Sequence, residues 1–123
     1  MKIRIKENTV RLRLSRPDID RFGKDGYLEE KTEFPGSTFT YAIQKLFDGK
    51  NLDASFTDKK LTLFVPHKIQ EEWISTDVTG FNHQLPIGEN KTLFLLIEKD
   101  FQCIDGEATE DQTEYFNNPV KSC

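Results

Sequence analysis

Cysteine is scarce in this sequence: among 123 residues it occurs only at Cys103 and Cys123. One pair forms neither the disulfide framework of small secreted domains nor the C-x₂-C spacing of a zinc site. Long apolar runs are missing too, because the longest, LFLLI at residues 93–97, is far too short to span a bilayer. Charges interrupt the N-terminal segment MKIRIK, so no signal peptide is expected. These absences favour a cytoplasmic protein that does not associate with membranes.

Motifs for catalysis or cofactor binding are absent as well. The sequence has no G-x-S-x-G, no P-loop and no dinucleotide-binding fingerprint. Three potential transition-metal ligands, His67, His83 and Cys103, show no ligand spacing. The net charge of −4 argues against general affinity for nucleic acid. We therefore favour a protein that is not an enzyme, assign it no cofactor, and do not expect nucleic acid as its partner.

Alternation of apolar and charged residues is the strongest pattern that is present. In KIRIK, Ile3 and Ile5 lie on one face of a strand and the charges lie on the other. VRLRL at residues 10–14 alternates in the same way, and ENT at residues 7–9 suits a tight turn. Residues 2–14 therefore predict an antiparallel hairpin with one half-buried face.

Two short helices and three further hairpins are predicted by the rest of the chain. Ser15 followed by Asp18 resembles a capping box, and Gly23 and Gly26 are expected to stop the helix that it starts. PHKIQEEWIST forms the second helix, with Trp73 expected in the core. The remaining alternating segments pair around short turns: 27–34 with 37–47, 51–65 folded on itself, and 78–85 with 91–99, where Pro86, Gly88 and Asn90 lie in the turn.

The order hairpin, helix, hairpin occurs twice along the chain. VRLRLSRPDIDRF parallels LTLFVPHKIQEEW, which indicates a possible ββαββ duplication. We expect a single domain over residues 1–123, with possible halves 1–48 and 49–100. The predicted fold class is α+β: a mainly antiparallel sheet of about eight strands in hairpins with two short helices, either barrel-like or in two layers.

A ladder of basic residues is the first candidate site. Four side chains share one face of the predicted N-terminal hairpin: Arg4, Lys6, Arg11 and Arg13. Like charges that oppose one another across strands destabilise a sheet, so such a face favours a negative partner. We expect these residues to bind a protein partner or a small anion. The alternative is internal pairing, either with the acidic strand at residues 29–33 or with the acidic C-terminal segment.

The C-terminal segment is acidic, with seven acids against two lysines from residue 98 onward, whereas residues 1–24 hold eight Lys or Arg against three acids. Four acids resemble oxygen ligands for a hard cation: Asp105, Glu107, Glu110 and Asp111. Their order does not fit an EF-hand loop. A metal-binding protein or a metal-assisted hydrolase, with Cys103 or His83 contributing, is the alternative function. Because Phe101, Tyr115 and Phe116 suit a packed segment, we expect residues 101–119 to form an acidic strap that is ordered at least through Phe116.

Two stretches of the chain together resemble those of a small, uncharacterised bacterial domain family. They are KIRIK…VRLRLS at the start and EKDFQC…ED…NP near the end, so the resemblance covers nearly the whole chain. It implies a stand-alone cytoplasmic protein without an assigned activity, cofactor or partner. It carries no functional residue over to this sequence.

Overall fold

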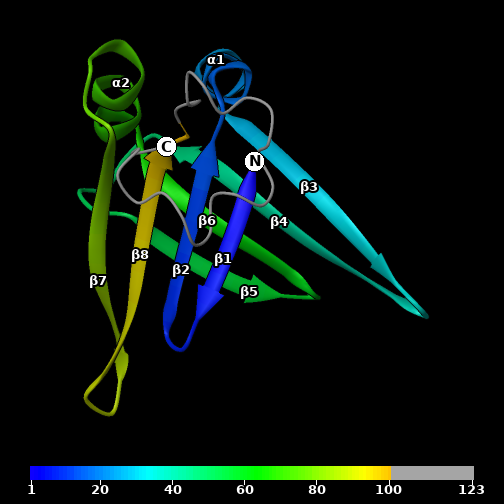
Figure 1. Ribbon diagram of the computed structural model, residues 1–123. Coiled ribbons are helices and arrows are strands. Elements are labelled where there is room, and N and C mark those ends of the chain that lie inside the picture. Colours follow the sequence, from blue (N-terminus) through cyan, green and yellow to red (C-terminus); the bar gives the residue numbers. More distant parts are fainter. Residues whose placement is uncertain (101–123) are drawn as a thin grey trace, which may run out of the picture.

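The computed structural model describes residues 1–100, so the strap predicted at residues 101–119 lies outside the described residues. Eight strands and two helices follow one another in the predicted order (Figure 1). They are β1 (Lys2–Lys6), β2 (Thr9–Leu14), α1 (Arg16–Asp25), β3 (Tyr27–Phe34), β4 (Ser37–Leu46), β5 (Asp53–Thr57), β6 (Lys60–Pro66), α2 (His67–Ser75), β7 (Gly80–Gly88) and β8 (Lys91–Lys99). The α+β fold class is confirmed.

The strands form two sheets that cross as two layers, with α1 and α2 at one end (Figure 1). Sheet A has the order β1-β2-β8-β7, and sheet B has the order β3-β4-β6-β5. All four predicted hairpins are antiparallel pairs, whereas β2 with β8 and β4 with β6 pair in parallel at the centres of the sheets. Of the two arrangements that the sequence allowed, residues 1–100 adopt the two layers and not the barrel.

The two halves of the described chain repeat the same strand pairings. The register of β1 with β2 recurs pair for pair between β5 and β6, so that Ile5–Val10 corresponds to Phe56–Leu61. The parallel pairing of β2 with β8 recurs between β6 and β4. Each half gives one hairpin to each sheet. Exchanging the two halves in this topology therefore exchanges sheet A and sheet B.

The hairpin turns use left-handed backbone where the chain reverses. Glu7 has a φ of 52°, as the first residue of a two-residue hairpin turn requires. The last turn is shorter than predicted, because Pro86 and Gly88 belong to β7; Asn90 lies in the turn as expected, next to Glu89. A bulge between Pro86 and Gly88 interrupts the regular pairing of β7 with β8. The strand can therefore contain a proline, which has no backbone N–H to donate.

The capping box predicted for the first helix is present. Ser15 Oγ accepts a hydrogen bond from the N–H of Asp18 (3.3 Å), and Asp18 Oδ2 accepts one from the N–H of Ser15 (3.0 Å). Gly23 does not stop α1 as we expected. The helix continues to Asp25 and ends at Gly26, whose φ of 71° is the left-handed conformation that terminates helices.

The core lies between the sheets and beneath the two helices. Trp73 of α2 and Phe22 of α1 are fully buried and pack edge to face, with ring centroids 6.3 Å apart. The indole N–H of Trp73 donates to the carbonyl of Thr79 at 2.9 Å, so its burial leaves no unpaired donor. Central-strand side chains fill the rest of the core: Leu12, Leu14, Ile43, Leu63, Val65, Leu95 and Ile97. Neither helix within residues 1–100 has the length and apolar character needed to cross a membrane.

Candidate functional site

The basic ladder predicted from the sequence lies on the outer face of sheet A, away from the core. Because the leucines of β2 point inward, the arginines between them point outward. We call this surface the basic face. It contains the side chains of Lys2, Arg4, Lys6, Arg11 and Arg13. Arg4 lies directly opposite Arg11, and Lys2 lies opposite Arg13, as the predicted hairpin required.

Part of this positive charge is neutralised within the chain. Glu98 of β8 lies beside Arg13 in the parallel register, and its Oε1 is 3.1 Å from Arg13 Nε and 3.8 Å from Arg11 Nη1. Asp100 Oδ2 is 3.1 Å from Lys2 Nζ, and its Oδ1 is 3.8 Å from Arg13 Nη1. The internal partners therefore come from the start of the acidic C-terminal segment. The acidic strand, the other predicted source, belongs to sheet B.

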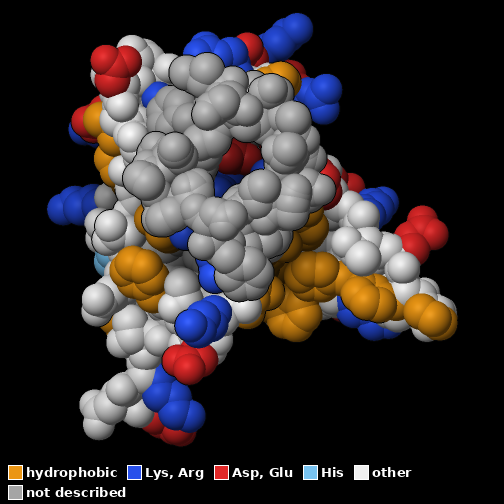
Figure 2. Space-filling view, in the orientation of Figure 1, with side chains coloured by type: hydrophobic (Ala, Val, Ile, Leu, Met, Phe, Trp, Pro, Cys, Tyr) orange, Lys and Arg blue, Asp and Glu red, His pale blue; other side chains and the backbone are white. Residues whose placement is uncertain are grey.

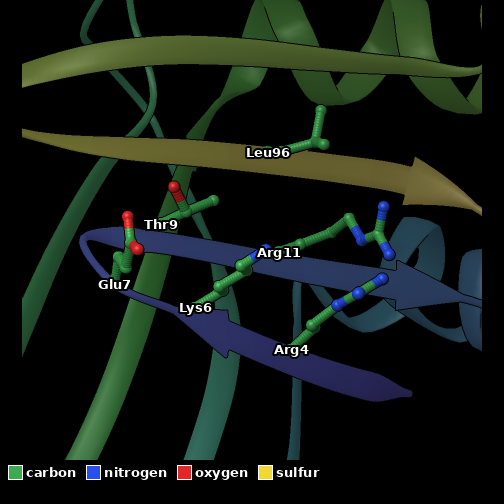
Figure 3. Close-up of a pocket in the computed structure, with 6 residues that line it drawn as sticks. All are labelled: Arg4, Lys6, Glu7, Thr9, Arg11 and Leu96. Carbon is green, nitrogen blue, oxygen red and sulfur yellow. The ribbon is translucent and has the colours of Figure 1, made fainter.

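Lys2, Arg4 and Lys6 are the exposed members of the basic face, and of these Lys2 pairs with Asp100. Within the described part of the chain neither Arg4 nor Lys6 makes an ion pair, and the buried Nε of Arg11 has no hydrogen-bond partner there. A shallow cavity of about 240 Å³ lies here, lined by Arg4, Lys6, Glu7, Thr9, Arg11 and Leu96. Figure 3 shows the guanidinium groups of Arg4 and Arg11 pointing toward the same end of this face. Two guanidinium groups in this arrangement suit one carboxylate or phosphate group.

Strand β8 adds apolar side chains that sequence reasoning had not placed beside the bases. In the parallel register Phe94 lies next to Thr9 and Leu96 lies next to Arg11, and both apolar side chains are half-buried on the outer face. The hairpin pattern carried no signal for this, because β2 and β8 lie far apart in the sequence. The site offers arginines beside apolar surface, a combination that is enriched in protein interfaces.

The predicted metal ligands do not come together in the described residues. His67 begins α2, where its Nε2 is 3.8 Å from Glu71 Oε1, whereas His83 lies in β7. Within residues 1–100 no group of three or more His, Cys, Asp or Glu side chains is placed to hold a metal ion. Cys103 and the carboxylates considered as ligands for a hard cation lie outside the described residues.

A second polar cluster lies on the outer face of sheet B. The hydroxyl of Tyr27 donates to Glu29 Oε1 at 2.6 Å and accepts a hydrogen bond from Lys60 Nζ at 2.6 Å. The hydrogen bond from Tyr27, helped by the charge of Lys60, holds the pKa of Glu29 below its ordinary value. The bond with Tyr27 likewise raises the pKa of Lys60. Because these groups satisfy one another, we interpret the cluster as a structural tie between β3 and β6.

The chain belongs to a family of unknown function, the DUF7009 family, whose model matches residues 1–120. This confirms the membership of an uncharacterised domain family that the paired motifs at the two ends of the sequence indicated. The chain matches no curated protein and no solved structure.

Proposed function

We propose that this member of a family of unknown function is a non-enzymatic binding protein that recognises an acidic segment of a partner protein on the basic face. Arg4, Lys6 and Arg11 would bind the carboxylates, while Leu96 and Phe94 would contact apolar side chains of the same partner. Hydrogen bonds between guanidinium and carboxylate groups are stronger than neutral ones and fix orientation. Arg13 would contribute mainly to the positive potential, because Glu98 and Asp100 already pair with it.

The observation that carries this proposal is a difference between two hairpins in equivalent places. The β5–β6 hairpin has the same register in sheet B that the β1–β2 hairpin has in sheet A. At the five positions equivalent to those of the basic face, it carries Asp53, Ser55, Thr57, Thr62 and Phe64. The architecture therefore does not require bases on this surface. Repulsion among them destabilises the sheet, and an acidic partner would relieve it.

Charge reversal tests the proposal. The double variant Arg4→Glu with Lys6→Glu should weaken binding of fluorescein-labelled hexaglutamate, measured by fluorescence anisotropy, by about tenfold or more. The physical reason is that a unit charge about 4 Å from another contributes about 1 kcal/mol even in water. The effect should shrink in high salt, which screens exposed charges.

A matched control separates the site from the net charge. Arg21→Glu with Lys24→Glu makes the same change in net charge on α1, where both side chains are exposed. This variant should bind hexaglutamate nearly as well as the unchanged protein. Equal weakening by both double variants would show that only the overall charge matters and that the basic face is not the site.

The size of the ligand and the location of the protein belong to the same proposal. If free glutamate displaces labelled hexaglutamate at the same total carboxylate concentration as unlabelled hexaglutamate does, the site takes a small anion and not a protein segment.

A cytoplasmic location is supported by the presence of only two cysteines, which fits a compartment where thiols stay reduced. A bacterial source is supported by the resemblance of the two terminal motifs.

A further inference from the structure

The outer edge of β1 is free within residues 1–100. β1 stands at the end of sheet A and pairs only with β2 there. In a two-residue hairpin the residues that flank the turn, here Lys6 and Thr9, exchange backbone hydrogen bonds, and such pairs alternate along an antiparallel ladder. This alternation directs the backbone N–H and C=O groups of Ile3 and Ile5 away from β2. An unpaired edge of this kind is a template for another strand.

Aromatic side chains line the inner face of sheet B, which extends past this edge toward the tip of the β3–β4 hairpin (Figure 1). Phe34 and Phe56 are 55% and 63% exposed, and Phe39 lies between them in the sheet with its ring 6.4 Å from that of Phe56. Tyr41 marks the inner end of this surface, where its hydroxyl donates to the carbonyl of Met1 at 3.1 Å. Figure 2 shows hydrophobic side chains gathered to the right of β1 and along the β3–β4 hairpin. Sheet A does not cover this part of sheet B, because the sheets cross.

We propose that the edge of β1 accepts an extended strand from the partner protein, in which acidic residues alternate with apolar ones. This inference rests on the proposed function and adds the mode of binding. Side chains of an added strand alternate between two faces. On the outer face they would meet Lys2, Arg4 and Lys6, so acidic residues fit. On the inner face they would meet Phe39 and Phe56, so apolar residues fit.

The other three edges of the two sheets lack this combination within the described residues. Edge strand β3 carries Glu29 and Glu33 on its outer face, where acidic side chains of an added strand would be repelled. Edge strand β5, which is equivalent to β1, presents Asp53, Ser55 and Thr57 on its outer face. Edge strand β7 carries Pro86 and a bulge, which interrupt pairing. A second copy of this chain is also disfavoured at β1, because pairing of β1 with itself would bring lysines and arginines together.

Two synthetic peptides of equal charge distinguish strand addition from simple charge attraction. The first is Glu-Val-Glu-Ile-Glu-Val-Glu, and the second has proline at each apolar position, which removes the backbone N–H groups that a strand needs. Both are titrated by fluorescence anisotropy against the full chain. The proposal expects the first peptide to bind at least about tenfold more tightly, because it gains both hydrogen bonds and apolar burial.

Two variants locate the strand. Ile5→Pro removes an N–H that faces the edge without touching the pairs with β2, and it should weaken binding of the first peptide about fivefold. Ile5→Val is its control and should leave binding unchanged. Phe56→Ser should weaken the first peptide about tenfold, whereas Ile87→Ser, at an exposed apolar residue of β7, should not. Urea midpoints establish that each variant is folded.

The outcomes separate this inference from the proposed function. If Arg4→Glu weakens both peptides but Ile5→Pro and Phe56→Ser weaken neither, the acidic partner binds without adding a strand, and the inference is wrong while the function stands. If Arg4→Glu weakens neither peptide, both are wrong. Self-association that Ile5→Pro abolishes would show that a second copy occupies the edge, which also overturns the inference.

Discussion

Replacing Glu98 with glutamine should lower the stability of the fold and raise its affinity for acidic peptides. Glu98 is the internal carboxylate that lies between Arg11 and Arg13, with N–O distances of 3.8 Å and 3.1 Å. All three side chains are partly buried, with exposed fractions of 22% for Glu98, 24% for Arg11 and 34% for Arg13. An ion pair that is partly open to solvent contributes up to about 1 kcal/mol. The free energy of unfolding should therefore fall by about 1–2 kcal/mol.

The rise in affinity follows from the same geometry. Glutamine keeps the shape of the side chain and removes a negative charge close to the cavity on the basic face. A carboxylate of the ligand about 5 Å away would no longer be repelled, which is worth about 0.8 kcal/mol in water. Hexaglutamate should thus bind about fourfold more tightly. Stability should fall while affinity rises. A general loss of structure would lower both, so it cannot explain this result.

Glu7→Gln is the matched control for this prediction. Glu7 also lines the cavity, but it forms no ion pair among residues 1–100. Its replacement makes the same change in charge, so it should raise affinity similarly while the free energy of unfolding stays within about 0.5 kcal/mol. Urea unfolding followed by circular dichroism gives the stability, and fluorescence anisotropy gives the affinity. If Glu98→Gln leaves the affinity unchanged, the ligand does not bind near Arg11, and if it leaves the stability unchanged, the ion pairs do not support the fold.

The remaining predictions concern stability. Burial opposes ionisation of the α-amino group of Met1 and of Asp18. The bond between them outweighs burial only together with the contacts of Glu30 to the amine and of Ser15 to the acid, so the pKa of the amine is raised from 8.0 and that of the acid is lowered from 3.8. The interaction between the amine and Asp18 should stabilise the fold fully between pH 3.8 and 8.0, and this stabilisation should be lost as the pH falls below or rises above these limits. Urea midpoints measured across this range give the change in stability. If the midpoint of Asp18→Asn falls at alkaline pH as much as that of the unchanged protein, the interaction is not the cause. Gly80→Ala should destabilise the fold by about 1–3 kcal/mol in urea unfolding, because an added Cβ would lie 2.2 Å from the carbonyl oxygen of Ile97. Gly23→Ala, in a helix where alanine is favoured by about 1 kcal/mol, should change stability far less, and equal losses would show that the close approach is not the cause.

Local patterns predicted the elements of this fold well. Alternation in KIRIK and VRLRL acts between neighbouring residues, and the capping box of Ser15 and Asp18 spans one helical turn. Both features appear in the structure, except that Ile5 of edge strand β1 is 57% exposed. The errors fell at ends of elements. Gly23 lies inside α1 and keeps the helical backbone, whereas Gly26 follows the last helical residue and takes the left-handed backbone that ends the helix.

The distribution of the hairpins between two sheets was not predictable in the same way. Each of the four hairpins has one apolar face, and that pattern is satisfied equally well beside any other hairpin. The structure instead joins the first hairpin to the last through the parallel pairing of β2 with β8. Such a pairing depends on how the whole core packs, and no residue near either strand signals it.

The candidate site shows the same division between local and distant information. Its bases follow from alternation within one hairpin, so Arg4, Lys6, Arg11 and Arg13 were found from the sequence. Its acids and apolar residues come from β8, so the sequence left two sources of negative charge open. The structure selects Glu98 and Asp100, because the parallel register places them beside β2.

Packing of the core, and not the ion pair, sets this register. A shift of β8 by one residue would replace the fully buried Leu95 and Ile97 on the inner face by Phe94, Leu96 and the charged Glu98. Burial of the Glu98 carboxylate without a partner would cost on the order of several kcal/mol, which exceeds the 1–2 kcal/mol estimated above for its ion pairs. The position of Glu98 on the outer face therefore follows from what the core can bury. This is why Glu98→Gln should keep the fold and the register while it frees Arg11 for a carboxylate supplied by another protein.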